Sequence, residues 1–167
     1  LTFEGSYLPP YSFALAEIAV FERVEDSAQS ILPFGGETAA LGYNIARDAL
    51  GGTVVSASNV ESDFAALTLI DGGVYDWGWY STDAAMPMEF VLSFHRNRTA
   101  MIGGVAFHPY AHFNTFRPIT VVARRIEVLV SETSATSDFT SIGVFNVDLD
   151  FSRQVFSFPP VAARFVK

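Results

Sequence analysis

The sequence contains no cysteine. This absence excludes a disulfide-stapled scaffold, a thiolate nucleophile and zinc sites built from cysteine. Lysine is almost absent as well: Lys167 is the only one, and the ten Lys and Arg residues face 18 Asp and Glu, for a net charge of −8. A nucleic-acid-binding protein needs a basic surface against the phosphates, so we expect no nucleic-acid partner. The same charge disfavours binding to membrane lipid.

Long apolar runs are also missing. None approaches the roughly 18 residues that a membrane span requires. Residues 1–4 have neither the basic start nor the apolar stretch of a secretory signal, and the first residue is not methionine. We therefore expect the chain to be excised or processed from a larger protein.

Apolar and aromatic residues are plentiful. Half of the 167 residues are hydrophobic and 14% are aromatic, including 16 Phe and two Trp. This composition excludes an intrinsically disordered chain, and the length suits one domain with a substantial core. No internal repeat or low-complexity linker divides the chain, so we predict a single domain over residues 1–167.

Apolar and polar residues alternate with a period of two along most of the chain, which is typical of half-buried strands. In residues 119–130, for example, Ile126, Val128 and Val130 fall on one face. Residues 13–22 fit a strand or a helix by pattern; we favour a strand, because they are rich in β-forming residues and no helix cap is evident. Further strands are predicted at 53–57, 88–95, 141–149, 154–158 and 162–167.

Turn signals separate these short strands. They include Gly103-Gly104 and Pro159-Pro160. Many short strands at this spacing, with no convincing helical period over more than about ten residues, predict an all-β sandwich or barrel.

Short motifs in a fixed order make the prediction more specific. In chain order the motifs are Asn44-Ile45-Ala46, Val54-Val55-Ser56-Ala57-Ser58, Leu69-Ile70-Asp71-Gly72, Gly78-Trp79-Tyr80-Ser81, Ile126-Glu127-Val128-Leu129-Val130-Ser131 and Ala163-Arg164-Phe165-Val166-Lys167. This order resembles that of the discoidin, or coagulation factor 5/8 type C, family of galactose-binding-like domains over residues 44–167. The resemblance implies a jelly-roll β-sandwich with ligand-binding loops at one end.

Relatives of this kind in bacteria are often carbohydrate-binding modules of extracellular enzymes or surface proteins. The resemblance therefore implies a monomeric, non-catalytic binding domain at the cell surface or outside the cell, with a glycan as ligand. A protein–protein adhesion module is the alternative, because exposed aromatic loops fit both. We expect no enzymatic activity: the chain has no G-x-S-x-G elbow and no Gly-rich phosphate loop.

One departure from the family concerns its last strand. Family members continue after the motif at residues 163–167 into a closing strand, whereas here the matching pattern, Leu15-Ala16-Glu17-Ile18-Ala19-Val20, stands near the start. A circular permutation would supply this strand from residues 1–25. Alternatively, residues 1–25 belong to a preceding copy in a tandem array. We favour the permutation, because the segment is apolar enough to need burial.

The resemblance also implies a structural Ca²⁺ beside the Asp-Gly turn. Calcium takes six to eight oxygen ligands from carboxylates and carbonyls. Asp71 matches the family aspartate, with the carbonyls of Thr68 and Gly73 beside it. Glu17 and the carbonyl of Ala16 match the distal ligands if the permuted strand is real. The alternative is an ordinary turn in which Asp71 bonds to its own backbone.

Two segments carry the residue types that recognise sugars, namely aromatic faces with a few fixed polar groups. One is residues 75–80, from which we select Trp77. The other is the predicted loop 108–117, from which we select His108, Tyr110, His112 and Arg117 as ligand-binding residues. The alternative for this loop is that its aromatic side chains pack back onto the sandwich. We assign Trp79 to the core, where the matching family tryptophan lies.

Overall fold

The computed structural model describes residues 2–6, 13–23, 42–58, 66–73, 79–81, 87–109, 112–114, 117–119, 123–150 and 152–167. In these residues the chain forms antiparallel strands and only short helical turns, including Asp48–Leu50 and His95–Asn97, so the prediction of an all-β fold is confirmed. No helix in the described part of the chain is long and apolar enough to cross a membrane.

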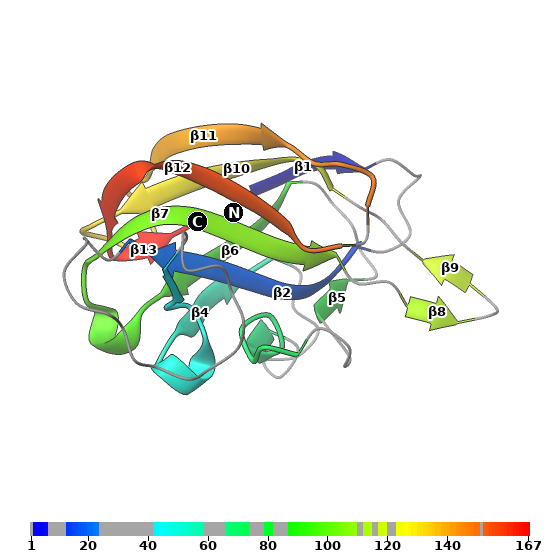
Figure 1. Cartoon of the computed structure of the whole chain (residues 1–167), viewed down its shortest axis with the longest axis horizontal. Coiled ribbons are helices and arrows are strands. Elements are labelled where there is room, and N and C mark those ends of the chain that lie inside the picture. Colours follow the sequence, from blue (N-terminus) through cyan, green and yellow to red (C-terminus); the bar gives the residue numbers. More distant parts are fainter. Residues whose placement is uncertain are drawn as a thin grey trace.

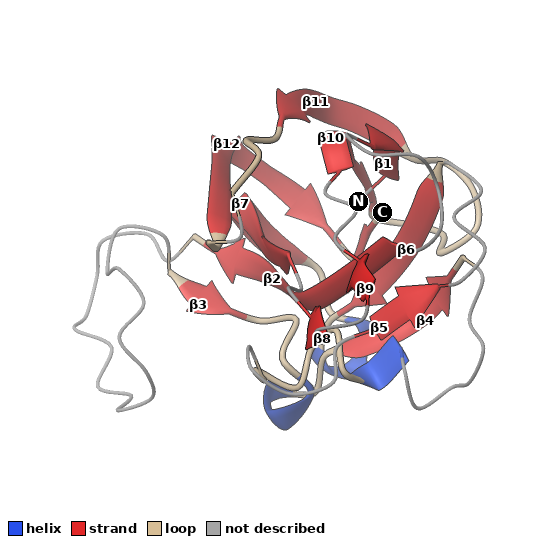
Figure 2. Cartoon of the chain, turned by 90° about the vertical axis from the view of Figure 1, so that its right-hand side faces the viewer, coloured by secondary structure: helices blue, strands red, loops and turns tan. Residues whose placement is uncertain are grey.

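Two antiparallel sheets lie face to face (Figures 1 and 2). In the first sheet the path β1-β10-β13-β6-β4 is extended by β11, which pairs with β10; in the second, the path β12-β7-β2-β3 is extended by β5, which pairs with β2. The strands of the first are β1 (Thr2–Ser6), β4 (Thr53–Ala57), β6 (Met88–Ser93), β10 (Ala123–Ser131), β11 (Thr140–Asn146) and β13 (Phe165–Val166). Those of the second are β2 (Phe13–Glu22), β3 (Tyr43–Asn44), β5 (Trp79–Ser81), β7 (Ala100–Pro109) and β12 (Gln154–Ala163).

A single hydrophobic core fills the space between the sheets. It joins Phe90 and Ile126 of the first sheet to Ile18 and Val105 of the second. The face predicted from residues 126, 128 and 130 is buried as expected. Because both sheets contribute to one core, the arrangement is a β-sandwich.

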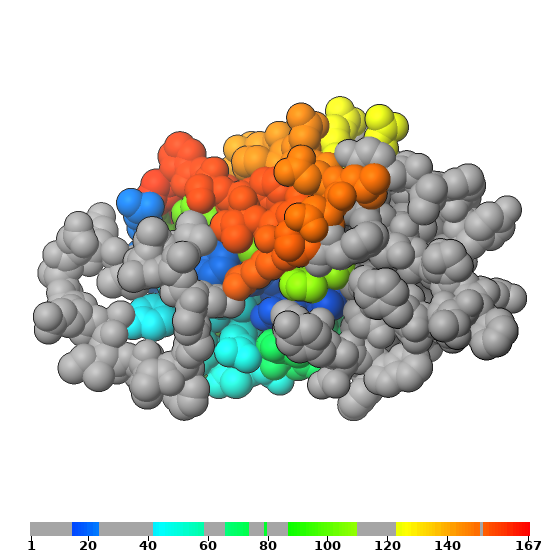
Figure 3. Space-filling model, turned by 45° about the vertical axis from the view of Figure 1, so that its right-hand side comes forward, coloured from blue at the N-terminus to red at the C-terminus, as the bar shows by residue number. Residues whose placement is uncertain are grey.

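The segment predicted at residues 13–22 is a strand with those bounds, β2. It pairs with β7 along one side and with β3 and β5 along the other. In the space-filling view, atoms of β12, β7 and β2 follow one another down the face of this sheet (Figure 3). The N-terminal segment thus lies inside the sandwich formed by its own chain.

Two predicted turns are wrong. Gly103-Gly104 lies inside β7 and Pro159-Pro160 inside β12. Both pairs coincide with register shifts after which the strand continues: β7 has one extra residue opposite β2, and β12 has two extra residues opposite β7. The prolines are tolerated because β12 is the edge strand of its sheet, where a missing N–H costs no ladder bond.

Trp79 is the largest side chain in the core. It is fully buried, and its ring meets that of Phe90 edge to face, with centroids 4.9 Å apart and planes at 89°. The sequence-based assignment of Trp79 to the core is therefore confirmed.

Replacing Trp79 with alanine should destabilise the domain strongly. Removal of a buried indole leaves a cavity, so we expect a loss of about 3–5 kcal/mol in urea unfolding. The control is Leu149→Ala, whose side chain is 63% exposed, with an expected change below about 0.5 kcal/mol. Equal losses in the two variants would contradict this description of the core.

Candidate functional site

Glu17 faces away from the core. The register of β2 against β7 shifts between Leu15 and Glu17, so the core-facing side chains change from Leu15 to Ile18 and Val20. Glu17 then shares the outer face of the sheet with Ala19 and Phe21. Even so, Glu17 is only 6% exposed, and a carboxylate that is this buried requires polar partners.

His108 is the residue directly opposite Glu17 on β7. Side chains in such antiparallel pairs point to the same face, with Cβ atoms about 5 Å apart. The His108 ring is half-buried, and its Nδ1 lies 2.9 Å from the carbonyl oxygen of Pro109. Because a carbonyl oxygen only accepts, Nδ1 donates the hydrogen bond, and Nε2 is the acceptor of the neutral ring. The outer face thus carries an oriented imidazole beside a carboxylate.

Asn44 connects Glu17 to the backbone of its surroundings. Its Oδ1 accepts hydrogen bonds from the N–H groups of Val20 at 3.1 Å and Ala46 at 3.2 Å, and its Nδ2 donates to Oε1 of Glu17 at 3.5 Å. Asn44 is 7% exposed. Its buried amide therefore makes three hydrogen bonds, and the two that Oδ1 accepts hold β2 and the segment after β3 together. The Asn-x-Ala motif signalled this residue, but sequence reasoning assigned it no role.

The turn at residues 66–73 docks against the middle of β2. The N–H of Ile18 donates to the carbonyl oxygen of Leu69 at 2.7 Å, and the N–H of Asp48 donates to that of Ile70 at 3.1 Å. Leu69 and Ile70 are fully buried and anchor the turn in the core. The turn is thus held by main-chain bonds on two sides.

The expected calcium ligands come from segments that the fold brings together. Ala16 and Glu17 precede Ile18, while Thr68 precedes Leu69, and Ile18 and Leu69 share a hydrogen bond. Asp71 and Gly73 follow on the same turn. A buried carboxylate and nearby turn carbonyls are the oxygen donors that Ca²⁺ prefers, so the donor chemistry fits.

Two local features bear on this site. Asp71 is exposed, and its Oδ1 accepts the N–H of Gly73 at 2.7 Å, which is the self-bonded turn given above as the alternative. The guanidinium of Arg47 fills the space that a Cβ on Gly72 would take, so a positive charge stands beside the turn. Among the described residues, no group of three or more His, Cys, Asp or Glu is placed to hold a metal.

The predicted loop at 108–117 is instead largely strand and hairpin, so this prediction is wrong. His108 lies within β7, and His112 and Arg117 lie on β8 (His112–Asn114) and β9 (Arg117–Ile119). In register, His112 faces Ile119 and Arg117 faces Asn114. The hairpin projects from one end of the sandwich (Figure 1).

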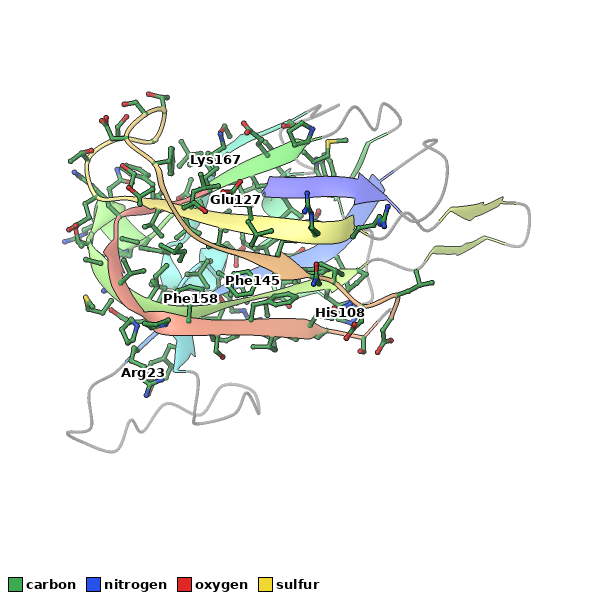
Figure 4. The ribbon with its side chains drawn as sticks, turned by 90° about the horizontal axis from the view of Figure 1, so that it is seen from above. Arg23, His108, Glu127, Phe145, Phe158 and Lys167 are labelled. Carbon is green, nitrogen blue, oxygen red and sulfur yellow. The ribbon has the colours of Figure 1, made fainter. Side chains whose placement is uncertain are left out.

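The structure brings part of the predicted site together. His108 lies beside Glu17, at the end of the sandwich from which the hairpin projects (Figure 4). Trp77 and Tyr110 lie outside the described residues. The pairing of a predicted sugar-binding residue with a predicted metal ligand had no signal in the sequence, because cross-strand neighbours depend on register.

No protein-family model, curated protein or solved structure matches the chain.

Replacing Asn44 with alanine should weaken the whole site. The change leaves two buried N–H groups, those of Val20 and Ala46, without their acceptor, so we expect a loss of about 2–4 kcal/mol in urea unfolding. Asn146→Ala, at an exposed position of β11, is the control and should change stability by less than about 0.5 kcal/mol. If Asn44→Ala costs no more than this control, Asn44 does not hold β2.

Proposed function

We propose that this chain is a non-catalytic carbohydrate-binding domain of the discoidin type, acting outside the cell, and that its sandwich is a jelly roll. The observation that carries the proposal is the pair of His108 and Glu17 on the outer face of the second sheet. Sugars are recognised by a few polar groups held in fixed orientations next to aromatic faces.

Both groups of the pair are held in place. Asn44 donates to the carboxylate of Glu17, and the Pro109 carbonyl orients the His108 ring. In a neutral His108 ring, Nε2 accepts from a sugar hydroxyl. Glu17, which is 6% exposed and is assigned to calcium, lies beside this ring. Side chains that are already ordered lose little entropy on binding, so a small site of this kind gains affinity.

Four further residues complete the proposed sugar site, and two of them belong to the hairpin of β8 and β9. We assign ligand contacts there to His112 and Arg117, and we assign the aromatic stacking surface to Trp77 and Tyr110.

Calcium has a structural part in the proposal. A cation held by Glu17 and Asp71, with carbonyls of Ala16, Thr68 and Gly73, would add to the hydrogen bond between Ile18 and Leu69. Its chemistry is that of a hard cation that neutralises carboxylates and orders the turn against β2.

The second candidate is a protein–protein adhesion module. Leu50 is 48% exposed and Leu67 is 49% exposed. They stand on neighbouring segments, which the hydrogen bond from Asp48 to Ile70 holds together. Exposed large apolar side chains on adjacent segments favour contact with another protein.

Carbohydrate binding is tested by affinity electrophoresis with calcium, against galactose-containing and acidic polysaccharides. His108→Ala should lower the affinity at least tenfold, because an oriented hydrogen-bonding group is lost. The matched control is His95→Ala, in the exposed turn between β6 and β7, which should leave migration unchanged. If the unmodified chain binds no glycan at millimolar concentration, the proposal fails and the adhesion module takes its place.

Removal of calcium should lower the melting temperature. A metal that binds only the folded chain stabilises it by mass action, so EDTA should lower Tm by several degrees at micromolar protein concentration. In Asp71→Asn, which keeps an oxygen for the Gly73 N–H, EDTA should have a much smaller effect. An unchanged Tm in the unmodified protein would remove calcium from the proposal.

A further inference from the structure

The first and last strands of the chain occupy the same place in the first sheet. β1 pairs antiparallel with both β10 and β6, and β13 pairs antiparallel with the same two strands. Figure 1 marks the two ends of the chain beside each other. The two strands therefore run in one direction through one slot.

The register of each strand against β10 gives the number of ladder positions that lie between them. Val166 lies opposite Val130, and Lys167 exchanges two hydrogen bonds of 2.8 Å with Leu129. Thr2 lies opposite Glu127. One position of β10, residue 128, lies between these two partners. If residue 1 is placed directly after residue 167, one residue, Leu1, likewise lies between Lys167 and Thr2.

Register against β6 gives the same result independently. Val166 lies opposite Leu92 and Thr2 lies opposite Glu89, which leaves two positions of β6 between them. Read head to tail, two residues also lie between Val166 and Thr2, namely Lys167 and Leu1. On β6 and on β10 alike, the number of ladder positions between the two strands thus equals the number of residues between them when residue 1 is placed after residue 167.

One ion pair spans this interval. Nζ of Lys167, at the end of β13, lies 2.7 Å from Oε1 of Glu89, which is opposite Thr2 of β1. Lys167 and Glu127 lie beside the start of β1 in Figure 4. The ion pair therefore links the end of β13 to the residue of β6 that pairs with the start of β1.

We infer that β13 and β1 are the two halves of one strand of the first sheet, which would run without interruption if residues 165–167 were joined to residues 2–6 through Leu1. The facing edges of β6 and β10 form an acceptor surface that takes two segments from far apart in the sequence in a single register.

This inference rests on register alone and does not depend on carbohydrate binding.

The test compares permuted chains that differ only at the join. All are opened between Thr136 and Ser137, an exposed point of the turn between β10 and β11. One joins Lys167 directly to Leu1, one omits Leu1, and one inserts two glycines. We expect the direct join to have the highest Tm, by about 5–10 °C. Omission of Leu1 slips β1 by one residue and sends its side chains to the opposite face, whereas two inserted glycines must either bulge out of the ladder or shift β1 by two positions away from its partners.

Hydrogen exchange gives a second readout. In the directly joined chain, amides at residues 2–6 and 165–167 should exchange at least tenfold more slowly than in the original chain, because an unbroken strand does not fray at its middle. If the three joins are equally stable, or if the glycine join is the most stable, the ends are merely close together and the inference is overturned.

A cyclic variant controls for any loss of stability caused by the new chain ends at Thr136 and Ser137. The full chain, cyclised head to tail, has no new ends and should melt about 5–15 °C above the linear chain, because closure restricts the unfolded state. A cyclic chain with the two-glycine join should gain less. A direct cyclic join that melts at or below the linear chain would also overturn the inference.

Discussion

The need of β2 for main-chain partners on both edges organises the second sheet. β7 pairs with β2 along most of its length, but on the other edge β5 reaches only residues 13–15 and β3 only residues 21 and 22. The stretch between them would leave buried N–H groups unpaired, at about 1–3 kcal/mol each. The carbonyl of Leu69 accepts the N–H of Ile18, and Oδ1 of Asn44 accepts that of Val20. A turn and one amide side chain thus replace the missing part of a strand.

The candidate site follows from this replacement. Because Leu69 accepts the N–H of Ile18, the turn that carries Thr68 and Asp71 docks on the strand that carries Ala16 and Glu17. Because Asn44 must reach the N–H of Val20, its Nδ2 is left to bond Glu17. The bulge before Glu17 then sets this carboxylate on the outer face, opposite His108. The segments that carry the groups proposed to bind calcium and sugar therefore lie together because the backbone of β2 needs hydrogen-bond partners there.

The first sheet meets the same constraint with the two ends of the chain. β6 and β10 are too far apart to pair with each other, so the slot between them needs a strand along its length. β13 fills one part and β1 the other, in one continuous register. The described residues of the two strands keep this register although no peptide bond joins them, because a ladder requires hydrogen-bonding groups in register and not chain continuity.

The sequence by itself determined the all-β class, the bounds of β2 and the core face of β10. These depend on local alternation and on side-chain hydrophobicity, which any five to ten residues display. The burial of Trp79 was expected from the resemblance to a known family. Only the tertiary structure decided that Gly103-Gly104 and Pro159-Pro160 lie within strands, because a bulge depends on the partner strand. It also decided that Glu17 lies beside His108, that Asn44 completes an edge of β2, and that β13 and β1 share one register. Those relations join residues far apart in the chain, and cross-strand pairing between them leaves no periodic trace in either segment.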